Sequence, residues 1–337
     1  MLVHRILDAA GQTWPPFVLV GGLLLVGAVA AEDGLFEAVG GRLARLRASG
    51  AGLLVALLAL DACVTAVLNL DTAVVFLTPV LVHAARARGL REAPFLYGSV
   101  LTANGASTLL PGSNLTNLLV LDGGAPGGGA FAARMLPAWL VSCAVTFLVL
   151  ALGLPPGRGR RDAAEPPPLV LRAGAAATVA AAIAVVLLPQ PALPVAAIGI
   201  GACVVRRLRP RLDLRVPALL FVVAVGLGVL ARSWHGPAHL LAGSGRWTTA
   251  AVAAAGSVAL NNLPAAVLFS AVTPPHPFAL LLGLDLGPNL AVTGSLSAFL
   301  WLQAARGVAA RPSIARYSLL GLVLVPLTLA ASVAVTS

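Results

Sequence analysis

Residues 109–121 read LLPGSNLTNLLVL, and this stretch decides the fold. It lies within apolar sequence long enough to cross a bilayer, yet residues 111–117 include a proline, a glycine and small polar side chains. Hydrocarbon offers no water to satisfy broken backbone, so such a break is tolerated only where it lines a cavity or binds a ligand. A second broken stretch, residues 283–297 (GLDLGPNLAVTGSLS), lies in the other half of the chain. Two such stretches in matching positions predict the binding site of a transporter.

The composition indicates an all-α polytopic membrane protein. Of the 337 residues, 59% are hydrophobic and only 10% are charged, which excludes an ordinary soluble domain. All 22 basic residues are arginines, and they cluster between the apolar runs. This pattern follows the positive-inside rule, so the net charge of +10 indicates cytoplasmic loops rather than a nucleic-acid partner. The lipid bilayer of the cytoplasmic membrane is therefore the expected environment.

Two interrupted apolar runs predict re-entrant hairpins. The first covers residues 53–82, with its tip at residues 69–72, because the run is short for two crossings of about 20 residues each and long for one. Arginine clusters precede and follow it, and only a hairpin keeps both clusters on the cytoplasmic side. The second covers residues 248–272. An interfacial amphipathic helix is expected over residues 32–50. The expected crossings, of which 94–121 and 278–303 are broken, are residues 14–31, 94–121, 135–154, 171–188, 191–205, 217–231, 278–303 and 317–335.

The two halves of the chain align as an internal repeat. The aligned pairs are Phe17 with Phe221, Asn69 with Asn261, and Ser113 with Ser295. On the predicted topology the paired elements run in opposite orientations. Inverted repeats of this kind place both hairpin tips and both broken helices near the membrane midplane, where alternating access can expose one site to either side.

The repeat predicts how the chain is divided. Residues 1–154 form the first inverted repeat, residues 155–170 a cytoplasmic linker rich in proline and arginine, and residues 171–337 the second repeat. The spans at 171–188 and 191–205 have no counterpart in the first half. The first repeat is therefore expected to be shortened by two spans.

Short motifs carry a family resemblance. They are LTANGAS at 101–107, GSNLTNL at 112–118, LNNLP at 260–264, DLGPN at 285–289 and TGSL at 293–296. Through them the chain resembles the ArsB/NhaD-type permeases of the ion transporter superfamily, and most closely the arsenite-efflux permeases. The resemblance implies a scaffold domain and a moving transport domain that contains both hairpins. It also implies arsenic resistance through extrusion of arsenite or antimonite, either in exchange for protons or through a soluble ATPase partner, and leaves a homodimer open.

A site for arsenite needs neutral hydrogen-bonding groups, because arsenite is an uncharged trihydroxide at neutral pH. Asparagine, serine and threonine at the tips and breaks supply both donors and acceptors. The alternative role for such residues is polar contact between helices. The candidate substrate-binding residues are Asn69, Thr72, Asn104, Ser113, Asn114, Thr116, Asn117, Asn261, Asn262, Asn289, Thr293 and Ser295.

Three of the acidic residues lie inside apolar segments: Asp61, Asp71 and Asp285. A membrane-buried aspartate costs about 2.5–3.5 kcal/mol on insertion scales, so each is a functional candidate. Asp71, at a hairpin tip, is the first candidate for binding the coupling proton or sodium ion. Asp285 comes next, with capping of the adjacent helix break as its alternative role. Asp61 lies in a helical arm and could instead pair within the scaffold.

Other functions remain open. A sodium/proton antiporter of the same fold would bind a hard cation at Asp71 and nearby carbonyl groups. A symporter for small carboxylates would need an arginine or several helix N-termini facing the substrate, and it ranks lower because no intramembrane arginine is apparent. No catalytic set, metal-ligand spacing or cofactor motif indicates an enzyme, since the histidines fall at loop or interface positions of the predicted topology. A membrane scaffold without transport activity is a further alternative.

Overall fold

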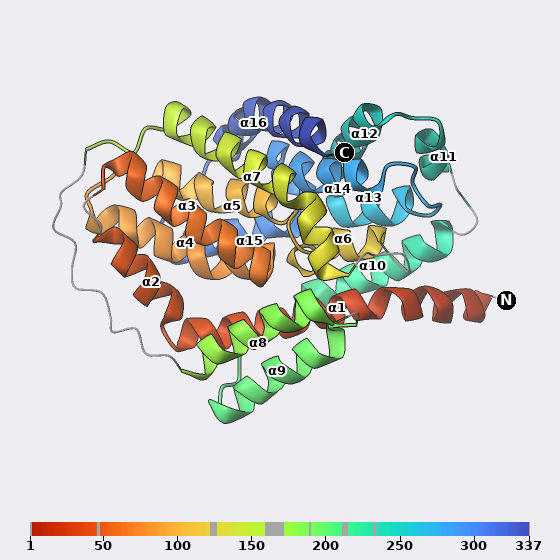
Figure 1. The fold of residues 1–337 in the computed structure, drawn as a ribbon, viewed down its shortest axis with the longest axis horizontal. Helices are drawn as coiled ribbons and strands as arrows, with labels where there is room; N and C mark the ends of the chain where they lie inside the picture. Colours follow the sequence, from red (N-terminus) through yellow and green to blue (C-terminus); the bar gives the residue numbers. More distant parts are fainter. Residues whose placement is uncertain are drawn as a thin grey trace.

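The computed structural model describes residues 2–45, 48–121, 127–158, 172–188, 190–210, 215–231, 234 and 236–336. Within these ranges the chain is helical and contains no strand (Figure 1). The first part comprises α1 (Leu2–Glu32), α2 (Leu35–Ala44), α3 (Gly50–Val67), α4 (Leu70–Ala87), α5 (Ala93–Ala106), the short 3₁₀ helix η1 (Pro111–Ser113), α6 (Leu115–Val120) and α7 (Gly128–Gly153).

The second part follows the predicted linker, of which residues 159–170 lie outside the described residues. It comprises α8 (Ala173–Leu187), α9 (Ala192–Val205), α10 (Arg215–Ala231), α11 (Gly236–Ala242), α12 (Arg246–Leu260), α13 (Asn262–Phe269), α14 (Pro277–Leu286), the 3₁₀ helices η2 (Gly287–Leu290) and η3 (Val292–Gly294), α15 (Leu296–Gly307) and α16 (Ile314–Val335). The helix α7 begins at Gly128, seven residues before the crossing predicted over 135–154.

Several helices are long and apolar enough to cross a membrane. Among the described residues these are α3, α4, α7 and α16, and α1 from Phe17 onwards passes the same test together with α2, from which it is bent by 61°. The prediction of an all-α polytopic membrane protein is confirmed. Within the range 32–50 predicted for an interfacial helix, the structure has the shorter helix α2, whose axis the bend sets at a large angle to that of α1. Its interfacial location stays a prediction.

Both predicted hairpins are pairs of helices joined by a tight turn, but their arms differ from the expectation. The arms α3 and α4 have 18 residues each, so the first hairpin is longer than the apolar run from which it was predicted. The argument from insufficient length was wrong, because each arm alone could cross a membrane. In the second hairpin α12 has 15 residues and α13 only 8, which is too short to cross. That either turn stops inside the bilayer stays a prediction.

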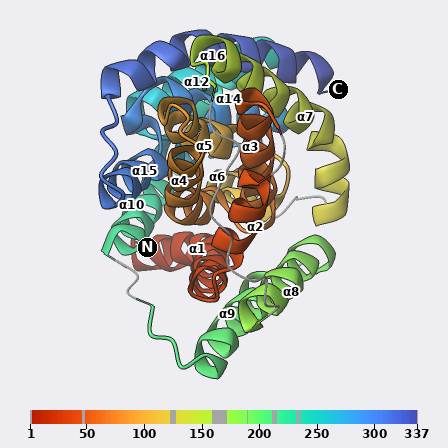
Figure 2. The same cartoon turned by 90° about the vertical axis from the view of Figure 1, so that its left-hand side faces the viewer.

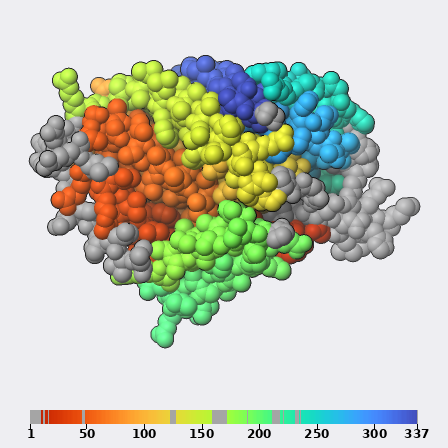
Figure 3. Space-filling view, viewed as in Figure 1, coloured from red at the N-terminus to blue at the C-terminus, as the bar shows by residue number. Residues whose placement is uncertain are grey.

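The broken helices occupy the centre of the molecule. Every residue of α5 from Pro94 to Ala106 is buried, as is every residue of α14 from Ala279 to Leu286. Figure 2 shows α5 and α6 enclosed by α3, α4, α7 and α16. The surface in Figure 3 is formed largely by α3, α7, α8 and α9. Both breaks therefore lie in the protein interior rather than against lipid.

The helices α8 and α9, for which the predicted repeat gives no counterpart in the first half, pack on α1 at backbone contact. A Cβ at Gly22 would lie 2.8 Å from Ala196 Cα, and one at Gly174 would lie 2.6 Å from Ala30 Cα. Asp33, just after α1, links this helix to α8 and α9. Its carboxylate accepts a hydrogen bond from Gly174 N at 2.8 Å and forms an ion pair with Arg206 at 2.7 Å.

The aligned residues Phe17 and Phe221 lie in contact, with ring centroids 5.3 Å apart and the rings edge to face. This contact joins α1 to α10. Contact between equivalent helices is compatible with the predicted repeat, whose inverted arrangement and boundaries stay predictions.

The end of α4 and the start of α5 meet the ends of α7 and α15 and the start of α16. These segments carry several arginines: Arg86, Arg88, Arg91, Arg306, Arg311 and Arg316. Here Arg86 donates to Val308 O at 2.7 Å, which joins the end of α4 to the end of α15, and Arg91 N donates to Pro156 O at 3.0 Å. We call this region the arginine-rich end. The positive-inside rule predicts that it faces the cytoplasm.

Candidate functional site

The first helix break is held together by side chains. After α5 ends at Ala106, Ser107 O accepts hydrogen bonds from Ser113 Oγ at 2.5 Å and from Asn117 Nδ2 at 2.8 Å. Asn114 caps α6, accepting from Thr116 N at 3.2 Å. Carbonyl groups at the end of a helix have no partner within it, and here the polar residues of 113–117 supply the missing bonds. This is why the stretch can break inside the protein.

The second break follows α14 and consists of η2 and η3. Tyr317, on α16, donates from its hydroxyl to Pro288 O at 2.9 Å. Two glycines allow the neighbouring helices to approach: a Cβ at Gly287 would lie 2.7 Å from Ala254 Cα, and one at Gly321 would lie 2.7 Å from Leu290 Cα. The broken backbone is thus clamped between α12 and α16.

The two breaks meet at Asp285. This carboxylate is buried, and its Oδ1 accepts hydrogen bonds from Asn114 Nδ2 at 2.8 Å and from Thr116 Oγ1 at 2.7 Å. The predicted capping role for Asp285 is not what the structure shows, because the carboxylate bonds to the other broken helix instead of its own.

A second set of hydrogen bonds joins α5, which precedes the first break, to η2 in the second break. Asn104 Nδ2 donates to Asn289 Oδ1 at 2.8 Å, and Asn289 Nδ2 donates to Leu101 O at 3.1 Å. Both asparagines are fully buried. Residues predicted separately from the two halves therefore form direct pairs.

The tip of the first hairpin reaches the second break. Asn69 caps α4, accepting from Thr72 N at 2.6 Å. Two residues on, Asp71 Oδ1 accepts a hydrogen bond from Ser297 Oγ, in the first turn of α15, at 3.0 Å. Ser295 caps α15, accepting from Ala298 N at 3.4 Å. The N-termini of α4 and α15 are thus adjacent.

The tip of the second hairpin reaches the same break. Asn261 Nδ2 donates to Thr293 O at 3.0 Å, and its Oδ1 accepts from Leu263 N at 3.3 Å. The backbone of Asn261 has φ +81° and ψ 148°, a combination that is strained for any residue other than glycine. Asn262, the first residue of α13, is buried, whereas Thr293 is exposed.

Five buried polar atoms of these candidates have no hydrogen-bond partner within the described chain. They are Asn69 Nδ2, Thr72 Oγ1, Asn104 Oδ1, Asn117 Oδ1 and Asp285 Oδ2. Because buried polar atoms in native proteins are nearly always paired, each of these atoms is a candidate contact for a substrate, ion or water. We call the tips, the breaks and these atoms the polar centre.

Asp61 does not join the polar centre. It is fully buried in the arm α3, and neither of its oxygens has a partner among the described residues. The predicted pairing of Asp61 within the scaffold is absent from the described structure. A role in coupling stays a prediction.

Sequence reasoning missed three members of the centre. Ser107 links both sides of the first break, Ser297 bonds Asp71, and Tyr317 bonds the second break. Ser107 and Ser297 both lie inside the motifs singled out from the sequence. Tyr317 carried no such signal, since it stands at the start of an ordinary apolar span.

The charge of the polar centre comes from carboxylates and helix ends. Asp71 and Asp285 contribute carboxyl groups, and none of the residues named in the centre is an arginine. The N-termini of α4, α13 and α15 lie beside the second break and bring partial positive charge to this region. An arrangement of this kind can bind an anion without a cationic side chain.

Broken helices and hairpin tips that meet at a buried polar centre define a membrane transporter. The family model of the citrate transporters, CitMHS, matches residues 3–305, so the chain belongs to the CitMHS citrate transporter family and is a secondary transporter. Among solved structures, the fold is similar to that of the Alcanivorax borkumensis YdaH transporter, whose crystal structure revealed an unusual topology. The TM-score is 0.58 at 15% identity, with 99% of this chain and 86% of YdaH covered. A search of the curated proteins finds no match.

These comparisons correct the family expected within the superfamily, from arsenite-efflux permeases to citrate transporters. The resemblance to ion transporter permeases is supported at the level of the superfamily, and the multi-pass membrane location is confirmed. The arsenite specificity expected from the motifs is not supported by the family match, and neither are antimonite, the ATPase partner or the homodimer. The carboxylate alternative, ranked lower from the sequence, fits the family better.

Proposed function

We propose that the protein is a secondary transporter of a small carboxylate anion of the citrate type, moved together with a coupling cation by alternating access at the polar centre. The family match supports the substrate class. The observation that carries the proposal is the convergence of the N-termini of α4, α13 and α15 on the paired helix breaks.

A carboxylate site needs positive charge, and helix N-termini can supply it where no intramembrane arginine is present. Asn69, Asn261 and Ser295 cap α4, α13 and α15 with side-chain oxygens. Each N-terminus is equivalent to about half a positive charge, and N–H groups at such ends bind carboxylates directly. Asn69 Nδ2 adds a buried donor that has no partner in the described chain. An uncharged trihydroxide would gain little from this positive potential, whereas a carboxylate gains both charge and hydrogen bonds.

A coupling cation is required because the substrate carries several negative charges. Moving each charge across a membrane potential changes the energy by about 2.3 kcal/mol per 100 mV. Asp71 and Asp285 are the candidate proton or sodium ligands, since each has one oxygen bonded to a hydroxyl or amide donor of a facing element. The facing donors keep the carboxyl groups in place while the cation enters and leaves.

Transport measured in proteoliposomes tests the proposal. We expect uptake of labelled citrate to respond to an imposed proton or sodium gradient and to be inhibited by other di- and tricarboxylates, with no response to arsenite. Asp71→Asn should abolish the gradient response. Thr178→Val, which removes a hydroxyl bonded to Gly174 O in α8 away from the centre, is the matched control and should transport normally. Arsenite transport without citrate uptake would refute the carboxylate proposal and restore the metalloid alternative.

A further inference from the structure

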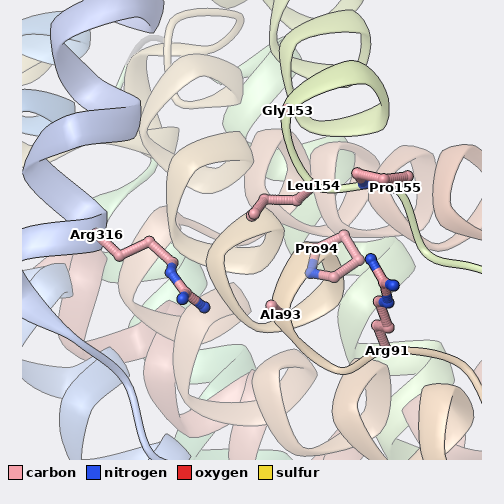
Figure 4. A pocket seen from close by; sticks show the side chains of 7 residues that line it. All are labelled: Arg91, Ala93, Pro94, Gly153, Leu154, Pro155 and Arg316. Carbon is pink, nitrogen blue, oxygen red and sulfur yellow. The ribbon is translucent and has the colours of Figure 1, made fainter.

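A cavity of about 280 Å³ lies at the arginine-rich end, where α5 and α16 begin and α7 ends (Figure 4). Two arginines, Arg91 and Arg316, line it together with small or apolar residues such as Pro94 and Leu154. In the view of Figure 4 the two guanidinium groups come from opposite sides, with Ala93 and Pro94 between them. The volume is slightly below the range of about 300–1,000 Å³ that is typical of ligand sites.

Both guanidinium groups are unpaired within the described chain, where neither has a hydrogen-bond or ion-pair partner. Glu92 is next to Arg91 in sequence but is engaged elsewhere, since Arg86 donates to its two carboxylate oxygens at 2.8 Å and 2.9 Å. The neighbouring carboxylate therefore does not neutralise the cavity. Two positive charges remain to attract an anion, and the N-terminus of α5 adds to them.

The cavity lies where two candidate membrane-spanning helices meet at their ends, which is the depth expected for lipid headgroups. The helices α7 and α16 are both long and apolar enough to cross a membrane, and the cavity is formed where they end. Leu152, on the last turn of α7, is 73% exposed, and Leu319, one turn beyond Arg316, is 64% exposed. These side chains place the lipid-facing surface directly beside the cavity. Basic pockets between helices on the cytoplasmic side are typical binding places for anionic headgroups.

We propose that this cavity binds a phosphate group, borne either by an anionic lipid headgroup or by a free phosphate anion. Guanidinium groups form paired, charge-assisted hydrogen bonds with phosphate oxygens. Leu154 and Pro94 offer an apolar wall for the glycerol and the first part of the acyl chains. The site is separate from the polar centre and does not depend on which substrate is transported.

Binding to the purified full-length protein in a neutral detergent tests the proposal. The probes are short-chain phosphatidylglycerol, phosphatidylcholine with the same chains, and inorganic phosphate, each titrated while the thermal midpoint Tm is followed. We expect phosphatidylglycerol to raise Tm and phosphatidylcholine to leave it unchanged. The double variant Arg91→Gln/Arg316→Gln should weaken phosphatidylglycerol binding about 30-fold, which is about 2 kcal/mol.

The matched control is Arg306→Gln/Arg311→Gln, which removes two exposed charges near the same end without altering the cavity lining. It should bind phosphatidylglycerol like the wild type. Equal weakening in both double variants, or in neither, would overturn the proposal. A rise in Tm from inorganic phosphate that lipid does not exceed would identify the free anion as the source. Should the cavity double variant not fold, Arg316→Gln alone must weaken binding about fivefold.

Discussion

Asn114 Nδ2 donates a 2.8 Å hydrogen bond to Asp285 Oδ1, and the two residues are 171 positions apart in the chain. Each lies at a break in a different helix, and both are buried. The bond ties the two halves together at the place where a transported anion would bind, so any movement of one broken helix against the other must act on it.

Replacement of Asp285 by asparagine tests whether its charge matters for coupling. The amide keeps the shape and one acceptor for Asn114 and Thr116, but it cannot take up a proton or hold a cation as a carboxylate does. We expect Asp285→Asn to fold and to lower gradient-driven citrate uptake by at least about tenfold, a loss of about 1.4 kcal/mol or more. Initial uptake rates in proteoliposomes measure this, with Glu92→Gln as a carboxylate control outside the polar centre. Uptake equal to that of the control would exclude Asp285 from coupling.

Close packing of the second break gives a prediction about stability. A Cβ at Gly287 would lie 2.7 Å from the backbone Cα of Ala254 in α12, so the two helices would have to move apart. We expect Gly287→Ala to lower the free energy of unfolding by about 1–3 kcal/mol, seen as a lower Tm in detergent. Gly201→Ala, in α9 with no atom within 4 Å of its Cβ, should be neutral or raise stability by up to about 1 kcal/mol. Equal effects would mean that the second break tolerates displacement.

Local sequence predicted both breaks and both hairpin turns, because proline, glycine and capping asparagines interrupt apolar helices through short-range effects. Helix ends were less predictable: α7 begins at Gly128, before the crossing predicted from residue 135, and α3 and α4 extend beyond their apolar run. The partners of the candidate residues could not be predicted at all. Asp71 bonds Ser297 at a separation of 226 residues, and only the packed structure brings such segments together.

The same reason explains the ranking of substrates. From the sequence, the lack of an intramembrane arginine ranked an anionic substrate lower. That ranking did not take account of three helix N-termini lying close together, because their convergence cannot be seen from sequence. In the proposed site that positive potential comes from backbone groups at helix ends, whose placement depends on tertiary packing. Charge composition alone therefore underestimates the capacity of broken helices to bind anions.

The ion pair at the arginine-rich end gives a prediction about pH. Hydrogen bonds from Arg86 hold the pKa of Glu92 below its ordinary value of 4.5. Since the folded pKa is lower than the unfolded one, the pair stabilises the protein above the ordinary value, and this contribution is lost as the pH falls through the lowered pKa. We expect Glu92→Gln to lower Tm slightly at neutral pH, with the difference from wild type closing in acid. Glu37→Gln, an exposed acid on α2, should show no such pattern, and a pH-independent difference at Glu92 would contradict the ion-pair account.

Two substitutions at Asn69 separate capping from substrate binding. The Oδ1 atom caps α4, while Nδ2 is buried without a partner in the described chain. Serine preserves a capping oxygen but has no amide donor, whereas alanine removes both, at a cost of about 1 kcal/mol in stability. We expect Asn69→Ser to keep the wild-type Tm and yet raise the KM for citrate at least about fivefold, as loss of a charge-assisted hydrogen bond requires. Asn69→Ala should show the same KM together with a lower Tm. If serine restores both KM and Tm, Asn69 serves only to start the helix, and the substrate binds elsewhere in the polar centre.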